Sequence, residues 1–170
     1  VAGCGGEAKK QVSTASYQGL EAPQLAAKVA AGQLPPLAQR LPAEPFVVQA
    51  VEEPGQYGGD WRQVHLGAPD RMQNMYLIQE HLGRWTRDHA KVIPSVAKGW
   101  EWSPDGCTIT FHLRPGMKWS DGDDFDADDF VFWYEDMIKY PPLADRIDDQ
   151  ELMVAGKLAE LKKIDQYTFA

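Results

Sequence analysis

The 170-residue sequence is poor in positive charge, has few cysteines and has no long apolar run. Lysine and arginine number 17 against 25 acidic residues, which gives a formal net charge of −8 and no basic cluster suited to phosphate backbones. No apolar stretch approaches the roughly 20 residues of a membrane-spanning helix. The two cysteines, Cys4 and Cys107, are far apart in the sequence, and we expect neither a disulfide nor a metal site from them. These absences argue against a nucleic-acid-binding protein.

Catalytic and metal-binding motifs are missing as well. The chain contains no H-E-x-x-H, G-x-S-x-G, P-loop or G-x-G-x-x-G. Its four histidines, none of which has a metal-ligand spacing, are His65, His81, His89 and His112. Cys107 alternates with Ile109 and Phe111, which predicts a small core residue rather than a nucleophile. We therefore expect no enzyme, no catalytic residue, no metal and no cofactor.

The first twenty residues are mostly small or polar and cannot form a core. The opening "VAGC" is similar to the bacterial lipobox, in which the cysteine becomes the lipidated first residue of the mature protein. We therefore expect Cys4 to be the lipid-attachment residue, followed by a disordered tether over residues 5–16. The expected division is a lipobox remnant and flexible tether over 1–20 and one folded region over 21–170.

Residues 21–82 predict a mixture of short helices and strands. An alanine-rich composition predicts a helix from about Gln24 that ends at Gly32, with a further turn or two after the proline pair 35–36. The other elements expected here are a strand at Phe46–Val51, a loop at 52–61, a strand at Arg62–Gly67 and a helix at Met72–Leu82.

A hairpin is the strongest local prediction in the chain. We expect a strand and a turn over 83–94 and a helical turn over 95–100, leading into the hairpin. Ser103-Pro104-Asp105-Gly106 has the residue order of a type I turn, in which Gly106 is free to take a positive φ. Residues 107–113 alternate apolar and polar side chains, which predicts a strand with one buried face.

A helix that begins with acidic residues is predicted next. Asp126 is the expected N-cap, Asp129 completes a capping box, and the charge of Asp128 suits the helix N-terminus. The expected apolar face consists of Phe130, Trp133, Tyr134 and Met137. Short strands are expected after residue 151, and the last of them is predicted to be incomplete, as in a fragment of a larger domain.

The acidic run from Asp121 to Asp129 has two other interpretations. One is calcium, because Asp124, Asp126, Asp128 and Glu135 fall at positions 1, 3, 5 and 12 of an EF-hand loop. That loop needs glycine at its sixth position, where this chain has Asp129, so helix capping is the better account. The other is a secreted hydrolase that uses these carboxylates, which requires at least one of them in a pocket with a perturbed pKa.

The stretch from Ile93 to Asp136 reads "IPSVAKGWEWSPDGCTITFHLRPGMKWSDGDDFDADDFVFWYED". It closely resembles the peptide/nickel-binding family of extracellular solute-binding proteins, which are the capture components of bacterial ABC importers. The shared segments are Asp-Gly at the hairpin turn, Thr-Phe-x-Leu-Arg, Lys-Trp-x-Asp-Gly and Ala-Asp-Asp-Phe, and they occur here in the family's order.

The resemblance implies an α/β fold of the type II periplasmic-binding-protein kind with a mixed α+β sheet. This chain would supply part of the first lobe, with the β-hairpin and packed helices, as the truncated N-terminal part of the domain. It also implies a monomer in the periplasm or on the outer face of the cytoplasmic membrane, in contact with the membrane through its lipid anchor. The protein would capture a peptide or similar small solute and deliver it to an ABC permease. Peptide, oligosaccharide and nickel complex all remain open as ligands, and a ligand sensor for a surface receptor remains an alternative.

Candidate ligand contacts lie in the predicted strand-to-helix loop at 67–74 and just after it. We expect Arg71, Asn74 and Tyr76 to contact the ligand, although ordinary loop and helix surface explains them equally well. Two readings are also open for the tryptophans. Trp100, Trp102, Trp119 and Trp133 are expected to fill a core. Trp61 and Trp85, with Tyr76, are candidates to line a ligand cleft.

Overall fold

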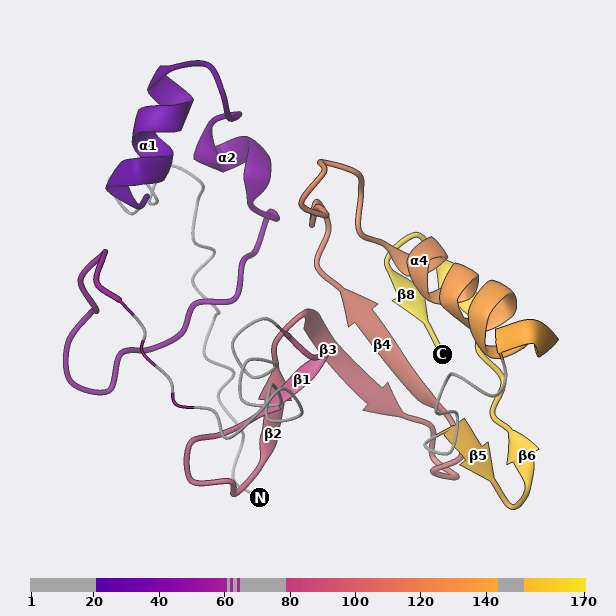
Figure 1. Ribbon diagram of the computed structural model, residues 1–170. Helices are drawn as coiled ribbons and strands as arrows, with labels where there is room; N and C mark the ends of the chain where they lie inside the picture. Colours follow the sequence, from indigo (N-terminus) through magenta and orange to yellow (C-terminus); the bar gives the residue numbers. More distant parts are fainter. Residues whose placement is uncertain (1–20, 61, 63, 65–78, 144–151) are drawn as a thin grey trace, which may run out of the picture.

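The computed structural model describes residues 21–60, 62, 64, 79–143 and 152–170. Its centre is a four-stranded sheet in the order β3 (Ala97–Trp102), β4 (Ile109–Leu113), β8 (Thr168–Phe169) and β7 (Lys163–Asp165), in which every neighbouring pair is antiparallel. Helix α4 (Ala127–Phe132) lies against this sheet, and two small two-stranded sheets, β1-β2 and β5-β6, flank it (Figure 1). Among the described residues, no helix is long and apolar enough to cross a membrane.

Strands β3 (Ala97–Trp102) and β4 (Ile109–Leu113) form the predicted hairpin. The amide of Gly106 donates to the carbonyl of Ser103 at 2.9 Å, and Gly106 has a φ of 68°, as the turn sequence requires. The expected helical turn over 95–100 is wrong, because β3 begins at Ala97 and pairs with β4 along its length. Only Ser95 and Val96 form a bend, and the residues from Ala97 to Trp102 belong to the sheet.

Cys107 is exposed, so its predicted place in the core is also wrong. Its amide donates to the Asp105 carboxylate at 3.1 Å, which makes Cys107 part of the turn. The strand begins two residues later, at Ile109. From Ile109 to His112 every side chain is half-buried, and Leu113 is buried, so the two faces of this strand differ less in burial than the alternating pattern predicts.

The Asp105 carboxylate gives the turn a dependence on pH. Hydrogen bonds from the Ser103 hydroxyl and then the Cys107 amide lower the pKa of Asp105 below its ordinary value. Since the folded pKa is lowered, the contribution of this group is present above the unfolded pKa and is lost as pH falls through the folded pKa. We predict that the protection of the Cys107 amide against hydrogen exchange, measured by NMR relative to the intrinsic exchange rate, falls over that acid range in the native protein. In an Asp105→Asn variant the same amide should show no such step, and a step that persisted would contradict this assignment.

The sheet is completed by β7 (Lys163–Asp165) and β8 (Thr168–Phe169), and Phe169 of β8 pairs with Phe111 of β4. The flanking hairpins are β1 (Gly83–Trp85) with β2 (Val92–Pro94), and β5 (Met153–Val154) with β6 (Lys157–Leu158). The strand and turn predicted over 83–94 and the short strands predicted near the end of the chain are thus confirmed.

Helix α4 begins at the predicted capping box. The Asp126 carboxylate accepts a hydrogen bond from the Asp128 amide at 2.8 Å, and the Asp129 carboxylate accepts one from the Asp126 amide at 2.9 Å. The helix continues as a π-helical stretch, Trp133–Ile138, and a short 3₁₀ turn follows at Pro141–Leu143. The predicted apolar face is confirmed, because Tyr134 is buried and Phe130, Trp133 and Met137 are half-buried.

Loss of the N-cap should destabilise the protein measurably. We predict that Asp126→Ala lowers the free energy of unfolding by about 1 kcal/mol, within the usual range for a lost cap. Chemical denaturation followed by circular dichroism measures this difference. Asp123→Ala is the matched control, because Asp123 is an exposed acid just before the helix that takes no part in the capping box. Equal losses in the two variants would show that general charge, rather than capping, matters here.

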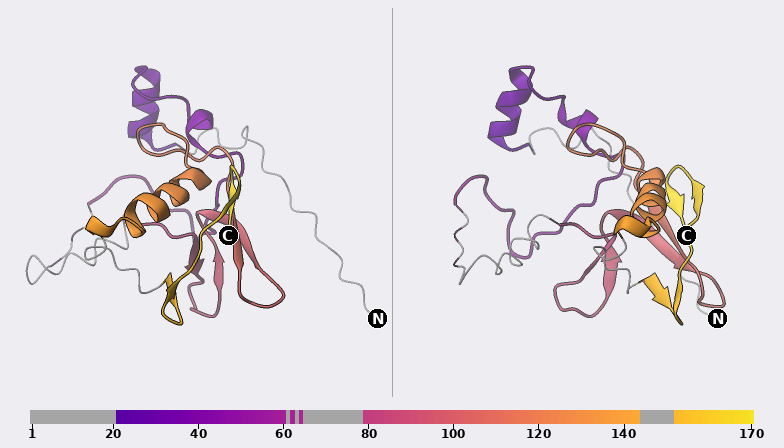
Figure 2. Two further views of the ribbon diagram at one scale, coloured as in Figure 1. Left: turned by 90° about the vertical axis from the view of Figure 1, so that its right-hand side faces the viewer. Right: turned by 45° about the vertical axis from the view of Figure 1, so that its right-hand side comes forward.

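The N-terminal part contains α1 (Pro23–Ala30) and α2 (Leu37–Arg40), which lie apart from the sheet (Figure 2). Gly32 follows α1 with a φ of 68°, as expected for a residue that ends a helix. The strand predicted at Phe46–Val51 is wrong, because this segment has no regular secondary structure and pairs with no strand among the described residues. Val48 and Val51 are 64% and 70% exposed, so their β-branched side chains are not packed against a sheet.

Two predicted elements fall largely outside the described residues. The strand at Arg62–Gly67 is described at residues 62 and 64 alone, and the helix at Met72–Leu82 is described from Gln79 onward. The four residues from Gln79 to Leu82 are not helical, so the helix cannot extend to its predicted end.

The core lies between the sheet and α4. Leu113, Ala127 and Phe169 are buried there, with Leu113 2% exposed. Phe169 stacks on Phe111 at 5.4 Å and on Phe130 at 4.2 Å between ring centroids, which joins both layers. This aromatic contact is where the alternating pattern of β4 meets the apolar face of α4.

Arg114 attaches the N-terminal segment to the sheet. Its guanidinium donates to the carbonyls of Glu44 at 2.7 Å, Ser95 at 3.0 Å and Ala97 at 3.4 Å. It also lies 5.9 Å from the ring centroid of Phe46. The residue is 8% exposed, and burial lowers the pKa of its guanidinium, which the charge of Glu44 partly offsets. One buried side chain thus joins three segments of the chain.

Candidate functional site

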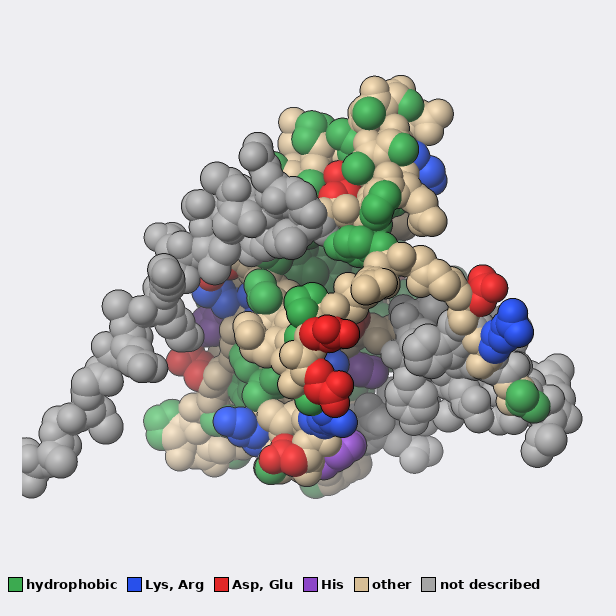
Figure 3. All heavy atoms as spheres, turned by 90° about the vertical axis from the view of Figure 1, so that its left-hand side faces the viewer, with side chains coloured by type: hydrophobic (Ala, Val, Ile, Leu, Met, Phe, Trp, Pro, Cys, Tyr) green, Lys and Arg blue, Asp and Glu red, His purple; other side chains and the backbone are tan. Residues whose placement is uncertain are grey.

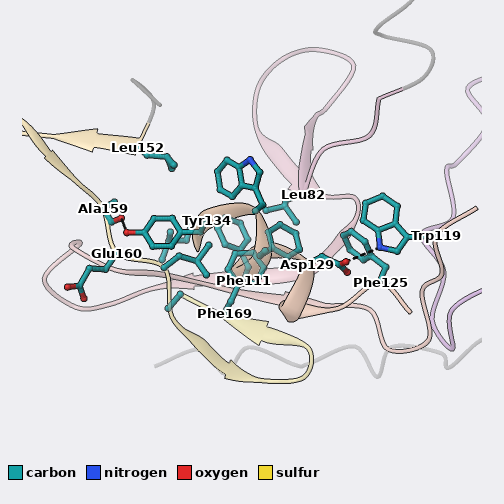
Figure 4. Close-up of a pocket in the computed structure, with 15 residues that line it drawn as sticks. Leu82, Phe111, Trp119, Phe125, Asp129, Tyr134, Leu152, Ala159, Glu160 and Phe169 are labelled. Carbon is teal, nitrogen blue, oxygen red and sulfur yellow. Dashed lines mark hydrogen bonds between the residues drawn. The ribbon is translucent and has the colours of Figure 1, made fainter. Parts of the chain in front are cut away.

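A large hollow in the described structure lies beside α4, between the four-stranded sheet and the β5-β6 hairpin (Figure 4). We call it the aromatic pocket, and its volume is about 550 Å³. Its walls are almost entirely aromatic and aliphatic. They are formed by Leu82, Ile109, Phe111, Trp119, Phe125, Asp129, Phe130, Trp133, Tyr134, Leu152, Ala159, Glu160, Leu161, Phe169 and Ala170.

The polar groups in these walls are bound to other parts of the chain. The Trp119 indole N–H donates to the Asp129 carboxylate at 3.1 Å, and the Tyr134 hydroxyl donates to the Ala159 carbonyl at 2.7 Å (Figure 4). A hydrogen bond from the Lys162 ammonium, 2.7 Å away, lowers the pKa of the Glu160 carboxyl, and its charge adds to the effect. The pocket therefore offers little that would recognise a polar solute.

A second, shallower hollow lies on the opposite face of the sheet. It has a volume of about 330 Å³, and its lining includes Lys98, His112 and Thr168. His112 Nε2 lies 3.5 Å from the Glu101 carboxylate, and His112 Nδ1 lies 3.5 Å from the Thr168 hydroxyl. The Lys98 ammonium in its lining pairs with the Glu44 carboxylate at 2.9 Å. On the face shown in Figure 3, basic and acidic side chains are interspersed.

The acidic run has structural partners. Asp126 and Asp129 form the capping box, while Asp124 pairs with Lys118 and Asp128 pairs with Lys163 at 2.6 Å. The backbone from Ala127 to Phe132 is helical, which contradicts the calcium-loop interpretation. Within the described ranges, no three histidine, cysteine, aspartate or glutamate side chains are grouped so that they could hold a metal ion. Asp129 alone of this run lines the pocket, and both of its oxygens accept hydrogen bonds from the chain.

Most of the predicted site residues lie outside the described part of the chain. These are Cys4, Trp61, Arg71, Asn74 and Tyr76. Trp85 is described and is 58% exposed. It stacks on His89 at 6.3 Å in the β1-β2 hairpin and does not line the aromatic pocket.

The four tryptophans expected in a core divide into two groups. Trp100 packs on Phe111 at 6.3 Å, and Trp133 is half-buried in the pocket wall. Trp102 and Trp119 are 61% and 48% exposed, so the core prediction is wrong for them. The pocket itself was not predicted from the sequence. The apolar residues Ile109 and Phe111 of β4 and Phe130 of α4, which belong to the two periodic patterns, line it.

Comparison with known proteins gives one family. Residues 91–170 match the model of the bacterial extracellular solute-binding proteins, family 5 Middle. The periplasmic alpha-galactoside-binding protein of Rhizobium meliloti is 38% identical in an alignment 160 positions long, which covers 82% of this chain and 23% of that protein. Di/tripeptide-binding protein 1 of Pseudomonas aeruginosa is 34% identical in an alignment 105 positions long, which covers 54% of this chain and 19% of that protein.

Solved structures agree. An oligopeptide-binding protein OppA superposes with a TM-score of 0.75 at 40% identity, covering 87% of this chain and 23% of that one. The binding protein MelB of Agrobacterium fabrum, solved with stachyose, gives a TM-score of 0.55 at 29% identity, covering 88% and 26%. The chain thus spans about a quarter of the length of these proteins. With its mixed helix and sheet arranged as in these periplasmic binding proteins, the chain belongs to the family 5 bacterial extracellular solute-binding proteins.

Proposed function

We propose that the protein is the solute-capturing component of a bacterial ABC importer. The observation that carries this proposal is the joint match of residues 91–170 to the family and of 87% of the chain to an oligopeptide-binding fold. The names of its relatives support it, since they are binding proteins for sugars, peptides and nickel. Capture of this kind is reversible and breaks no bond, which agrees with the lack of catalytic motifs.

The mechanism we propose assigns residues 21–170 to the first lobe of a two-lobed domain. The hairpin β3-β4 and helix α4 form a rigid wall of that lobe, and the second lobe closes over the solute by a hinge motion. The loaded protein, a monomer, then delivers the solute to a membrane permease. Cys4 carries the lipid that holds it at the outer face of the cytoplasmic membrane, with residues 5–20 as the tether.

Two ligand classes have specific support. Likeness to an alpha-galactoside-binding protein over 82% of the chain, and to MelB with bound stachyose, favours an oligosaccharide. Likeness to OppA over 87% of the chain favours a peptide. The proposed contacts Arg71, Asn74 and Tyr76 supply a guanidinium, an amide and a phenol, which hydrogen-bond to sugar hydroxyls or to peptide carbonyls equally well.

Tryptophan fluorescence of the whole protein tests the proposal, because closure changes the surroundings of indole rings. Titration with stachyose, with dipeptides, with longer peptides and with a nickel chelate should give a saturable change for one of these classes. A flat response to all of them would contradict the proposed function. A response to stachyose alone would assign the protein to oligosaccharides, and a response to peptides alone would assign it to peptides.

A substitution tests the proposed ligand contacts. We predict that Arg71→Ala weakens solute binding by roughly 10- to 100-fold, the loss expected when a charged hydrogen-bond donor is removed. Isothermal titration calorimetry with the solute identified above measures this change. Arg62→Ala is the control, because the Arg62 side chain is 90% exposed and lies 4.0 Å from Asp60. Unchanged affinity in Arg71→Ala would remove Arg71 from the site.

A further inference from the structure

We propose that Arg114 is a positioning residue for solute capture, because its buried guanidinium fixes both ends of the segment between residues 46 and 80. The proposed solute contacts Arg71, Asn74 and Tyr76 fall between these ends in the sequence, so the inference rests on the proposed function. Arg114 directly follows β4 and itself contacts no solute. It acts through the backbone that it holds.

The upstream end of this segment lies against Arg114 and the residue after it. The carbonyl of Glu44 accepts a hydrogen bond from Nη1 of Arg114 at 2.7 Å, and the ring centroid of Phe46 lies 5.9 Å from the same guanidinium. The amide of Ala43 donates to the carbonyl of Pro115 at 3.1 Å. The chain is therefore fixed to the end of β4 just before the segment begins.

The downstream end is fixed through the residues that lead into β3. The carbonyl of Leu82 accepts hydrogen bonds from the amides of Ser95 and Ala97, both at 3.0 Å. The Ser95 hydroxyl donates to the Glu80 carboxylate at 3.1 Å. The carbonyls of the same two residues, Ser95 and Ala97, accept from Arg114 at 3.0 Å and 3.4 Å. One short stretch of chain thus connects the downstream end to the guanidinium that binds the upstream end.

Burial makes this connection difficult to replace. Arg114 is 8% exposed, Ser95 is 5% exposed and Ala97 is fully buried, so water has little access to the carbonyls that the guanidinium binds. A charged donor strengthens such hydrogen bonds, and a buried carbonyl that loses its donor is costly. The guanidinium has several N–H groups in one rigid plane, which lets a single side chain bind three carbonyls at once.

The effect on solute binding follows from the fixed ends. A segment whose two ends are fixed has fewer conformations than one whose ends move independently. When only a fraction of the molecules is in the conformation that binds, the measured affinity falls by that fraction. Loss of the guanidinium releases both ends at once, so it weakens solute binding although Arg114 touches no solute.

The solute affinity of an Arg114→Ala variant of the whole protein tests the inference. Isothermal titration calorimetry uses whichever of stachyose, tri-alanine and a nickel chelate the unmodified protein binds, under conditions where circular dichroism shows the variant to be folded. We predict a dissociation constant at least roughly tenfold higher than that of the unmodified protein. Guanidinium chloride, at concentrations too low to unfold the protein, should restore most of the lost affinity, because the free ion fits the space that the side chain leaves.

Phe169→Ala is the matched control, because it also destabilises the fold but leaves the hydrogen bonds of Arg114 in place. Its affinity should stay within about twofold of the unmodified protein and should not respond to guanidinium. Ser95→Ala is a milder variant for the case in which Arg114→Ala does not fold, since it removes only the hydroxyl bond to Glu80. It should raise the dissociation constant by roughly threefold.

Three results would overturn the inference. Unchanged affinity in Arg114→Ala, or in Ser95→Ala where Arg114→Ala is unfolded, would show that the fixed ends do not matter for capture. An equal loss in Phe169→Ala would make the effect one of general stability. A loss in Arg114→Ala that guanidinium does not relieve would mean damage beyond the missing hydrogen bonds. Failure of the proposed function is distinct, because the unmodified protein itself would then bind none of the solutes, and that result would overturn both.

Discussion

Replacement of Phe169 by alanine is expected to lower the free energy of unfolding by about 3–5 kcal/mol, the usual cost of removing a buried phenylalanine ring. Phe169 is 5% exposed and contacts both layers of the fold, with Phe111 on the sheet and Phe130 on the helix. Its ring therefore contributes to the packing of β4, β8 and α4 at once. Its loss also leaves a cavity that the short strand β8 cannot collapse to fill.

Urea denaturation followed by circular dichroism measures the effect of Phe169→Ala. Phe132→Ala is the matched control, since Phe132 lies in α4 but is 60% exposed. The control should change the free energy of unfolding by no more than about 0.5 kcal/mol. Similar losses in the two variants would mean that the sheet and α4 do not share the core described above.

Arg114→Met is expected to cost a similar amount, about 3–5 kcal/mol, because it leaves a set of buried acceptors without a donor. The carbonyls of Glu44, Ser95 and Ala97 each accept a hydrogen bond from this guanidinium. Methionine has a stem of similar length but no N–H group. The variant should also free the segment around Glu44 from the sheet.

Denaturation again measures this loss, and limited proteolysis near Glu44 reports the release of the segment. Arg84→Met is the control, because its guanidinium lies over the same Phe46 ring, at 5.8 Å against 5.9 Å for Arg114, but Arg84 is exposed. The control should lose at most about 1 kcal/mol, the size of an exposed cation–π contact. If both variants lost the same amount, the Phe46 contact rather than the carbonyl contacts would explain the effect.

The features that the sequence predicted correctly are local ones. The turn at residues 103–106 and the capping box at Asp126 each depend on side chains within a few positions, which act on their own backbone. The apolar face of α4 was predictable for the same reason, since helical periodicity is visible in a short window.

The features that the sequence did not predict depend on distant partners. Phe46–Val51 has strand-like composition, but a strand needs an edge to pair with, and this segment has none in the described structure. Arg114 contacts Glu44, which lies 70 positions earlier in the sequence, so a short sequence window could not predict this contact. The exposure of Trp102 and Trp119 likewise depends on what covers them, which is a property of the whole domain.

The candidate ligand contacts remain predictions. Arg71, Asn74 and Tyr76 lie outside the described residues, and their selection came from the family resemblance rather than from a motif with its own chemistry. The family itself was predictable because the segments from Ile93 to Asp136 are specific in type and order, and the match over residues 91–170 confirms it.

The most direct test of the account is hydrogen–deuterium exchange of the whole protein, with and without saturating stachyose or peptide. The account treats the hairpin of β3 and β4, together with α4, as a framework that solute does not touch. Amides of residues 97–102, 109–113 and 127–132 should therefore exchange slowly in both states, while solute-dependent protection appears elsewhere in the protein. Strong protection by solute along Phe111, Trp119 or Phe130 would contradict the account, because it would place the captured molecule in the aromatic pocket.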